Sequence, residues 1–382
     1  MTALSVALGA QLPAIAALGW LTRHPLLVLL AAAALSATFV IDLRNLWDHS
    51  PRSRLHLYLG MWPFYAWWAI CVVFVPLLPL ALLVAALTPV SAQHALGAAF
   101  VLSVLGGLRG LARHPRVRRH TVLVPGLPAP FEGYRIAQIS DIHCGTFTPA
   151  AQVQRWVQRV NDLDVDLVAV TGDLITAGSE YVGAVSASLG ALRARDGVYG
   201  CMGNHDYFTD GELFAHELER QGMVLLRNRG VFLERQQQRI FLAGVDDTWT
   251  RRHDLKRALR ERPARMPTIL LAHDPDLFPS AAGQGVALTL SGHTHGGQFA
   301  LPVAPRRWNL ARVMTPFTSG LYRIGHAQLY VNRGLGTTGP PVRIGVPPEI
   351  AVFTLARAPH PDLSDRIHSF AEDVIREASE AS

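Results

Sequence analysis

Hydrophobic positions divide the chain into a front part with long uncharged runs and a longer remainder with short apolar runs. Between Arg54 and Arg109 there are 54 residues without Asp, Glu, Lys or Arg, more than twice the roughly 20 that one helix needs to cross a bilayer. Thr88-Pro89 is a natural turn between two spans. The uncharged runs predict about four helices, at 3–21, 26–41, 58–87 and 96–108. Residues 1–112 are therefore expected to form an all-α transmembrane region.

From Tyr134 onward the pattern changes to that of alternating strands and helices. Short apolar, β-branched runs repeatedly end in a polar cluster and are followed by a loop or a helical pattern. After Thr148-Pro149, a helix start, an apolar stripe recurs at helical spacing: Val153, Trp156, Val157 and Val160. We expect an α/β domain over 113–358 and a C-terminal surface helix or tail over 359–382, which has apolar residues at helical spacing and a net negative charge.

Composition excludes several classes of protein. Of 382 residues, 49% are hydrophobic and only 17% are charged, which excludes a disordered chain. Residues 1–120 contain nine Arg, no Lys and two acidic residues, whereas the rest of the chain is close to neutral. These arginines lie between apolar runs, as membrane topology requires, and not on a polar face that could bind nucleic acid. A nuclease is therefore disfavoured.

The arginines also predict an orientation. With four spans, all but one of the front arginines fall on one side: Arg44, Arg52, Arg54, Arg109, Arg113, Arg116, Arg118 and Arg119. Only Arg23 lies on the other side. The positive-inside bias then predicts a multi-pass protein of the inner membrane with both termini in the cytoplasm. A cleaved signal peptide is the alternative for the first run, but that run has no basic residues before it and further spans follow.

The spans themselves carry almost no chemistry. No ionisable residue lies in the middle of a span, so a proton- or ion-coupled transporter would lack its usual groups. Anchoring is the favoured role. An aromatic cluster of Trp62, Tyr65, Trp67 and Trp68 is typical of an interfacial belt, with a ligand cage as the alternative. The three cysteines form neither a disulfide pattern nor a metal-binding pair.

The candidate chemistry lies in the polar clusters, which all follow predicted strands, where α/β sheets gather their ligands. Together they supply four imidazoles, two carboxylates and an amide: Asp141, His143, Asp173, Asn204, His273, His293 and His295. This mixed oxygen and nitrogen set suits Mn²⁺, Fe²⁺ or Zn²⁺. Seven groups are too many for one ion with an open position, so two divalent metal ions are expected.

The ordered series Asp-x-His, Gly-Asp, Gly-Asn-His-Asp, a single His and Gly-His-x-His resembles the calcineurin-like metallophosphoesterases over about residues 120–357. Flanking segments, including Ala272-His273-Asp274-Pro275 and Arg333-Gly334-Leu335-Gly336-Thr337, resemble its membrane-anchored bacterial branch. The resemblance implies an α/β fold in four layers, an α-β-β-α sandwich of two sheets packed face to face. It also implies a centre of two metal ions, Mn²⁺ being favoured over Fe²⁺ or Zn²⁺, on the loops at one end.

The resemblance further implies a role for each residue. Asp141, His143 and His295 would hold one ion, Asn204, His273 and His293 the other, and Asp173 would contact both. The reaction would be hydrolysis of a phosphomonoester, phosphodiester or pyrophosphate by a metal-bridging hydroxide. His205 would protonate the leaving oxygen, and Asp206 would orient His205. A turn-capping acid is the alternative for Asp206.

Three positions leave alternatives open. Thr176 stands where many relatives carry a second acid or a Tyr, which argues against a ferric tyrosinate centre and leaves one supporting contact undefined. Cys144 is expected to be a small buried filler. Arg333 would either grip a substrate phosphate bidentately or serve the structure of a turn.

The candidate substrate is an amphiphile. The loop at 301–322 mixes arginines with large apolar residues, which suits a phosphate at a lipid surface, with an ordinary hairpin as the alternative. Relatives that cleave UDP-2,3-diacylglucosamine offer an analogy for a lipid-linked substrate. A catalytically silent membrane scaffold is the second class of function, and it is disfavoured because all the ligand positions are filled.

Overall fold

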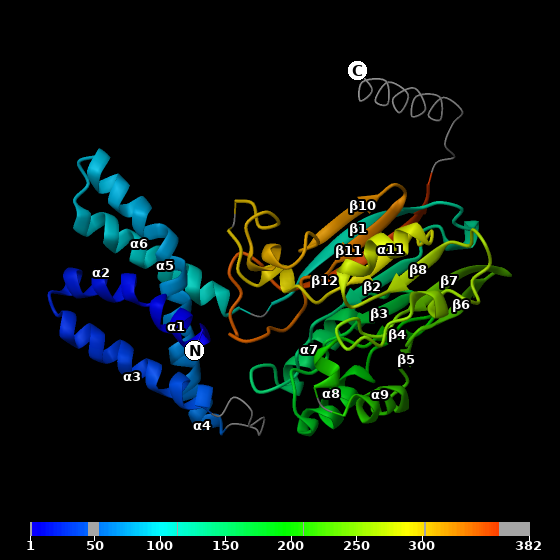
Figure 1. The fold of residues 1–382 in the computed structure, drawn as a ribbon, viewed down its shortest axis with the longest axis horizontal. Helices are drawn as coiled ribbons and strands as arrows, with labels where there is room; N and C mark the ends of the chain where they lie inside the picture. Colours follow the sequence, from blue (N-terminus) through cyan, green and yellow to red (C-terminus); the bar gives the residue numbers. More distant parts are fainter. Residues whose placement is uncertain (1, 45–52, 113, 209, 302, 359–382) are drawn as a thin grey trace, which may run out of the picture.

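A computed structural model of the chain describes residues 2–44, 53–112, 114–208, 210–301 and 303–358. An all-helical N-terminal region lies beside an α/β domain (Figure 1). The segment 359–382, expected to be a surface helix or tail, lies outside the described residues.

The front region consists of α1 (Thr2–Gly9), α2 (Leu12–Thr22), α3 (Pro25–Arg44), α4 (Arg54–His56), the short π-helix η1 (Leu57–Met61), α5 (Trp62–Leu87) and α6 (Ala92–Gly110). By length and composition, two helical stretches could cross a membrane, Ser5–Thr22 and Arg54–Leu87, and Pro25–Ile41 is shorter. One or two such helices alone are weak evidence for a membrane region. The expected total of four spans is thus not confirmed.

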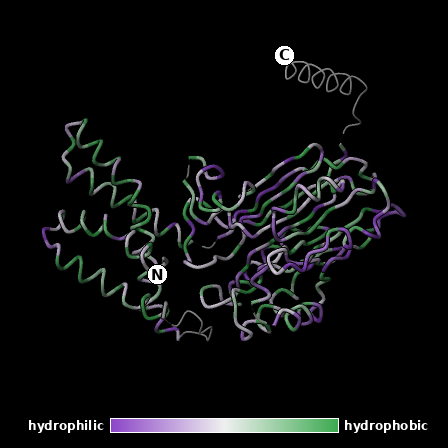
Figure 2. The backbone as a smooth tube through the Cα atoms, viewed as in Figure 1, coloured by the Kyte–Doolittle hydropathy of each residue, from purple (hydrophilic) through white to green (hydrophobic). Residues whose placement is uncertain are grey.

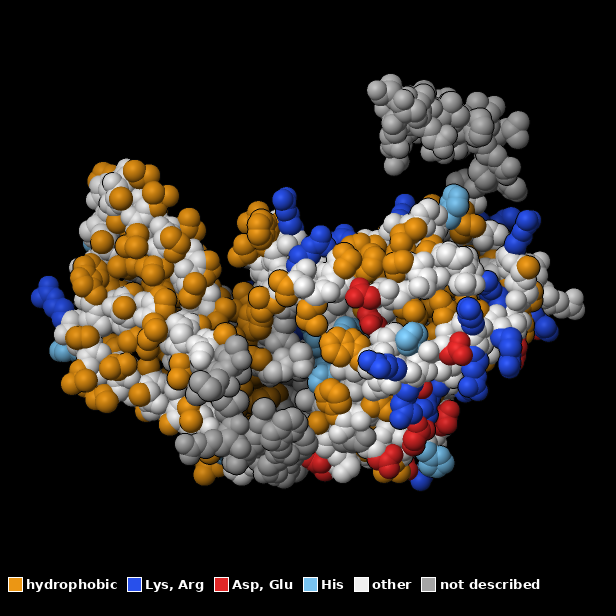
Figure 3. Space-filling view, in the orientation of Figure 1, with side chains coloured by type: hydrophobic (Ala, Val, Ile, Leu, Met, Phe, Trp, Pro, Cys, Tyr) orange, Lys and Arg blue, Asp and Glu red, His pale blue; other side chains and the backbone are white. Residues whose placement is uncertain are grey.

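The surface of these helices is apolar (Figures 2 and 3). Leu27, Leu87 and Leu105 are each more than 60% exposed, and contiguous apolar surface of this kind is costly in water. The helices pack on each other through small residues: a Cβ at Gly107 of α6 would lie 2.8 Å from the backbone nitrogen of Ile70 in α5. Close approach at glycine is typical of helix packing in lipid, where no hydrophobic effect drives association.

Two six-stranded sheets form the α/β domain. The first has the order β1-β12-β2-β3-β4-β5 and the second β10-β11-β9-β8-β7-β6. The strands of the first are β1 (Arg116–Val124), β2 (Arg135–Ile139), β3 (Leu167–Thr171), β4 (Val198–Cys201), β5 (Val224–Leu225) and β12 (Glu349–Arg357). Those of the second are β6 (Arg229–Arg235), β7 (Gln238–Gly244), β8 (Thr268–Leu271), β9 (Leu288–Ser291), β10 (Gly320–Ile324) and β11 (Ala327–Val331). β2 to β5 are mutually parallel, as are β7, β8, β9 and β11.

Helices cover the outer faces of both sheets. They are α7 (Ala150–Asn161), α8 (Val182–Leu189), α9 (Gly211–Arg220), α10 (Leu255–Ala258) and α11 (Phe278–Gly283). Short 3-10 turns are η2 (Ala129–Phe131), η3 (Ser179–Tyr181), η4 (His205–Tyr207), η5 (Pro275–Leu277), η6 (His295–Gly297) and η7 (Leu310–Val313). Strand residues alternate between layers, because neighbouring side chains point to opposite faces. Ile136 and Leu167 pack between the sheets, whereas Ala137 and Val168 pack with the outer helices.

The predicted stripe on α7 is buried, as expected. The helix begins at Ala150, with Pro149 as its cap, so the start lies one residue later than the expected cap at Thr148.

Aromatic side chains join the two regions. The ring of Trp68 in α5 lies 5.6 Å from that of Phe299, and Tyr65 lies 5.4 Å from Phe147. Trp62 also packs on Phe147. Trp67 instead contacts the helical region, where its Nε1–H donates a hydrogen bond to the side-chain oxygen of Gln11. Three members of the expected interfacial belt therefore contact the α/β domain.

Candidate metal centre

The predicted polar clusters lie on loops that leave the carboxyl ends of five strands. Asp141 and His143 follow β2, Asp173 follows β3, Asn204 follows β4, His273 follows β8, and His293 and His295 follow β9. The two sheets pack face to face, so these loops meet at one end of the sandwich.

The first group comprises Asp141, His143 and His295, whose candidate ligand atoms lie within 4.8 Å of one another. The Nε2 atoms of His143 and His295 are 3.0 Å apart, and Nε2 of His295 is 3.5 Å from Oδ1 of Asp141. All three side chains are buried. This is the set of three that the resemblance assigns to one ion.

A second group comprises Asp173, His273 and His293. Oδ2 of Asp173 lies 3.2 Å from Nε2 of His273 and 3.5 Å from Nε2 of His143, a member of the first group. Nδ1 of His293 lies 3.2 Å from Nε2 of His273. The carboxylate of Asp173 therefore stands between the two groups, and one carboxylate can hold two cations about 3.5–4 Å apart.

Burial leaves most of these imidazoles neutral. It lowers the pKa of His143 to about 3 and that of His293 to about 4. It also raises the pKa of Asp141 to about 7. Burial opposes protonation of His273, but the charge of Asp173 raises the pKa of His273 well above its usual range. Neutral imidazoles have the free lone pair that a metal ligand needs.

The backbone is strained at the same residues. Five of the seven candidate ligands have positive φ angles: 49° at Asp141, 47° at His143, 54° at Asp173, 71° at His293 and 52° at His295. This left-handed region costs residues with a side chain about 1–3 kcal/mol each and is concentrated at functional sites. The strain aims these side chains inward from the strand ends.

Two positions of the motifs require glycine because neighbouring atoms lie too close for a Cβ. A Cβ at Gly203 would collide with the carboxylate of Asp173, and a Cβ at Gly292 would collide with Ser140 and Asp141. The glycine that precedes Asn204 and the one that precedes His293 thus allow the loops to close around the carboxylates.

The residues fit divalent cations. Oδ1 of Asn204 is buried and has no hydrogen-bond partner among the described residues, and such an orphaned group is rare in proteins. The surrounding donors are carboxylate oxygens and imidazole nitrogens, which suit Mn²⁺, Fe²⁺ or Zn²⁺. A cation would use these lone pairs and neutralise the buried carboxylates.

His205 lies beside the first group, with its ring 4.7 Å from that of His143. Its Nδ1 is 2.8 Å from the carbonyl oxygen of Thr176, and its backbone N–H donates to Asp173. The expected contact between Asp206 and the ring is not made among the described residues. The group that orients His205 is a backbone carbonyl, which sequence motifs do not mark.

Asp206 instead organises the loops. Its buried carboxylate accepts hydrogen bonds from the backbone N–H groups of Asp173, Leu174, Ile175 and Gly203. The turn-capping alternative describes this geometry. Burial, with the nearby charge of Asp173, raises the pKa of Asp206 to about 7.

Arg333 and Arg343 each contact a buried side chain of the domain. Arg333 does not line the cleft described below; its guanidinium lies 3.6 Å from the carboxylate of Glu349 and its backbone N–H also donates to Glu349. The structural alternative for Arg333 therefore fits. Arg343, which the motifs did not single out, is buried, with Nη2 3.1 Å from Nδ1 of His295. Arg343 is not adjacent in sequence to any of the polar clusters, so the sequence gave no indication of its contact with His295.

A cleft of about 700 Å³ opens over the two groups. Its floor includes Asp173, His293 and His295, and its walls are largely apolar: Phe208, Trp249, Phe299, Leu310, Met314 and Pro340. An apolar cleft with a few convergent polar groups is the usual form of a ligand site.

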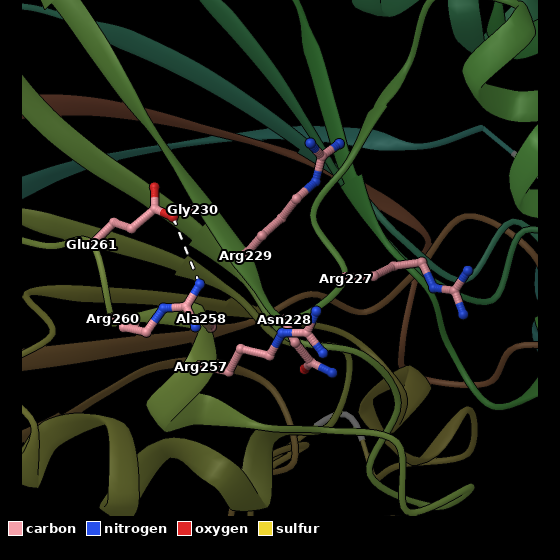
Figure 4. A pocket seen from close by; sticks show the side chains of 8 residues that line it. All are labelled: Arg227, Asn228, Arg229, Gly230, Arg257, Ala258, Arg260 and Glu261. Atoms are coloured by element: carbon pink, nitrogen blue, oxygen red, sulfur yellow. Dashed lines mark ion pairs between the residues drawn. The ribbon is translucent and has the colours of Figure 1, made fainter.

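A second, smaller cavity of about 140 Å³ lies near β6 and α10 (Figure 4). Four arginines line it, Arg227, Arg229, Arg257 and Arg260. Three of them are paired with acids: Arg227 with Glu212 and Asp246, Arg229 with Glu219, and Arg260 with Glu261. Pairing of three of the four arginines weakens the attraction of this cavity for an anion.

Comparisons with known proteins agree with the geometry. Residues 134–297, which include all seven candidate ligands, match the family described as calcineurin-like phosphoesterase. A zebrafish (Danio rerio) protein named "Transmembrane protein with metallophosphoesterase domain" is 37% identical over 273 residues, 68% of this chain and 61% of that protein. "Uncharacterized metallophosphoesterase YkuE" of Bacillus subtilis (strain 168) is 33% identical over 65% of this chain and 90% of its own length. "UDP-2,3-diacylglucosamine pyrophosphatase LpxG" of Chlamydia muridarum is 28% identical over 63% of this chain and 89% of its own length.

Proposed function

The chain belongs to the calcineurin-like phosphoesterase family, and from this premise we propose that it is a membrane-anchored, metal-dependent hydrolase of a phosphomonoester, phosphodiester or pyrophosphate. The observation that carries the proposal is the meeting of six potential ligands in two groups that the carboxylate of Asp173 links, with Asn204 lining the same cleft. A scaffold without activity would have no need of strained, buried ligand loops.

In this proposal Asp141, His143 and His295 hold one cation, Asn204, His273 and His293 hold the other, and Asp173 contacts both. Two bound cations supply an acidified water and neutralise the phosphoryl oxygens, and Mn²⁺ is the first candidate, followed by Fe²⁺ and Zn²⁺. Gly203 and Gly292 let the loops close, and Arg343 lies beside the ring of His295.

His205 is the proposed general acid. The carbonyl of Thr176 accepts the hydrogen bond of Nδ1–H, which leaves Nε2 to handle a proton at the substrate. Because His205 lines the cleft beside Asp173 and Asn204, this atom can reach the leaving oxygen of a phosphoester. Asp206 acts one step removed, as a positioning residue that holds the backbone of both loops.

The substrate is proposed to be lipid-linked. Apolar cleft walls beside apolar helices support an amphiphile, and the name of the Chlamydia relative makes UDP-2,3-diacylglucosamine one candidate. The helices are proposed to form a four-span anchor in the inner membrane, with the α/β domain in the cytoplasm. Reporter fusions after Arg23 and Arg357 test this topology: active reporters on the same side of the membrane would contradict it.

The direct test of function is hydrolysis of bis(p-nitrophenyl) phosphate by the purified full chain with Mn²⁺, Fe²⁺, Zn²⁺ or no metal. We expect metal-dependent turnover that is lost in His295→Ala and kept in His216→Ala, a control on the exposed surface of α9. Absence of turnover of mono-, di- and pyrophosphate esters with every metal would favour the silent scaffold.

A further inference from the structure

One loop of the α/β domain is apolar on its outside. The apolar loop, residues 301–314, joins η6 to β10, and its residue 302 is not described. Val303 is 97% exposed and Val313 is 89% exposed. Other large apolar side chains of the loop are also exposed: Leu301, Trp308, Leu310 and Met314. Clustered exposure of this kind marks an interaction surface.

The exposure is built into the fold, because the loop backbone is tied down. The side chain of Asn309 donates to the carbonyl groups of Pro305 and Arg306 and accepts from the N–H of Arg312. At the ends of the loop, the N–H of Leu301 donates to the carbonyl of Trp308, and Thr315 donates to Asp276. The backbone hydrogen bonds therefore hold the apolar side chains of the loop in exposed positions.

Basic residues alternate with these apolar ones. Arg307 and Arg312 are exposed, and Arg307 lies against the ring of Trp308. Hydrophobic and basic side chains lie side by side on the part of the domain that faces the helices (Figure 3), where the loop itself projects (Figure 1). Apolar side chains among arginines, with a Trp, are typical of an element that lies at an anionic lipid surface.

The inner side of the loop continues into the cleft. Leu310 and Met314 line the cleft together with His205 and His295. Phe299 also lines it, and packs on Trp68 of the membrane-type helix α5. An apolar path thus runs from the helices and the loop tip to the candidate metal ligands.

We propose that the apolar loop inserts into the headgroup region of the bilayer that the front helices occupy, with Arg307 and Arg312 on anionic lipid headgroups. The consequence for catalysis rests on the proposed function: a phosphoester borne by a lipid reaches the ligand groups along Leu310 and Met314. Its acyl chains remain in the bilayer while the phosphate enters the cleft.

The position of the loop is tested without any activity measurement. A nitroxide attached at Val313→Cys is compared with one at Glu234→Cys, an exposed site on β6 at the far end of the domain (Figure 1), in full-length protein in nanodiscs of phosphatidylcholine and phosphatidylglycerol. The native cysteines, Cys71, Cys144 and Cys201, are buried, so labelling is directed to the new thiol. We expect relaxation by oxygen to dominate at 313 and relaxation by a water-soluble nickel complex to dominate at 234. A label at 313 that is as accessible to nickel as the label at 234 would overturn the proposal. The same result is expected if the loop binds a protein partner and not lipid.

The route of the substrate is tested with two probes. Val303→Ser/Val313→Ser removes exposed side chains that do not line the cleft, and Leu213→Ser on α9 is the control. Hydrolysis of hexadecyl p-nitrophenyl phosphate in phosphatidylglycerol-containing vesicles should fall about tenfold in the double variant, as expected for lost insertion of two apolar side chains. Hydrolysis of soluble bis(p-nitrophenyl) phosphate should not change.

The outcomes separate the two proposals. Equal rates of the double variant and the wild type on the vesicle probe would overturn the insertion of the loop. Failure of the wild type to hydrolyse soluble mono-, di- and pyrophosphate esters with every metal would overturn the proposed function, while the nitroxide result would still decide the position of the loop.

Discussion

The ligand loops and the front helices depart from ordinary soluble structure in opposite directions. The loops bury three imidazoles and two carboxylates, and partly bury a fourth imidazole, on a backbone that is strained at five positions. The helices expose leucines to their surroundings and carry no Asp, Glu, Lys or Arg between Arg54 and Arg109. Water alone suits neither region: the loops lack positive charge and the helices lack an apolar solvent. Each region is therefore suited to a different proposed surrounding: the loops to divalent cations and the helices to lipid.

The two regions also meet. Phe147 follows the first ligand loop and Phe299 follows the last, and both pack on the aromatic face of α5. The backbone N–H of Arg343, whose side chain contacts His295, donates to the carbonyl of Gly110 at the end of α6. The helices therefore contact the ligand loops, in addition to their proposed role as a membrane anchor.

The largest effect should follow from removing the shared carboxylate. Asp173→Ala is expected to lower metal-dependent turnover of bis(p-nitrophenyl) phosphate at least about 10³-fold, because both ligand groups lose their common anion. Asp162→Ala, at the exposed end of α7, is the control and should retain wild-type turnover. Turnover of Asp173→Ala within about tenfold of wild type would show that the ligand loops do not work as one centre.

His205→Ala should act next most strongly and should depend on the leaving group. We expect a loss of about 10²-fold with an alkyl phosphoester, whose leaving oxygen needs a proton, and a much smaller loss with a nitrophenyl ester. Metal content, measured by elemental analysis, should stay at the wild-type level. Equal losses with both leaving groups would contradict the role of general acid, and loss of metal would make His205 a ligand.

Metal affinity should rise with pH. Asp173 raises the pKa of His273 well above its usual range, so the imidazole is protonated near neutral pH without a cation, and binding must release that proton. Apparent affinity should therefore strengthen by up to about tenfold per pH unit for each proton released and weaken as pH falls. Calorimetric titration of Mn²⁺ in two buffers of different ionisation enthalpy measures the protons. His273→Gln should lower their number, and His216→Gln should not; equal proton release in all three proteins would contradict this account.

The smallest effect concerns packing of the helices. Gly107→Ala places a Cβ 2.8 Å from the backbone of Ile70, whereas Gly97→Ala on the same helix meets nothing within 4 Å. We expect about 1–3 kcal/mol of destabilisation from the first and no loss from the second. Thermal unfolding of the full chain in detergent compares them, and equal transition temperatures would argue against close packing of α5 and α6.

Much of the fold was predictable because both regions have strong periodic patterns. The apolar runs that precede Asp141, Asp173 and His273 read as buried strands, and they are strands. Their order placed polar residues at strand ends, where the parallel topology brings them together. The number of spans was less predictable. Length and hydropathy distinguish poorly between a span and a short apolar helix such as Pro25–Ile41.

Contacts through the backbone could not be predicted. The resemblance implied that Asp206 orients His205, with a turn-capping acid as the alternative, and the carboxylate of Asp206 accepts from four backbone N–H groups. The ring of His205 pairs with a carbonyl of Thr176, whose side chain is immaterial to that bond. Arg333 lies in a glycine-rich segment typical of phosphate sites, but buried Glu349, distant in sequence, lies beside its guanidinium.

The number of bound metal ions per chain is the sharpest test of the two-metal centre. The full chain is stripped with chelator, reloaded with Mn²⁺ in detergent, and measured by elemental analysis together with anomalous diffraction from its crystals. The account predicts two ions per chain, one beside Asp141, His143 and His295 and one beside Asn204, His273 and His293, on either side of Asp173. No bound ion, or ions bound away from these seven residues, would contradict it.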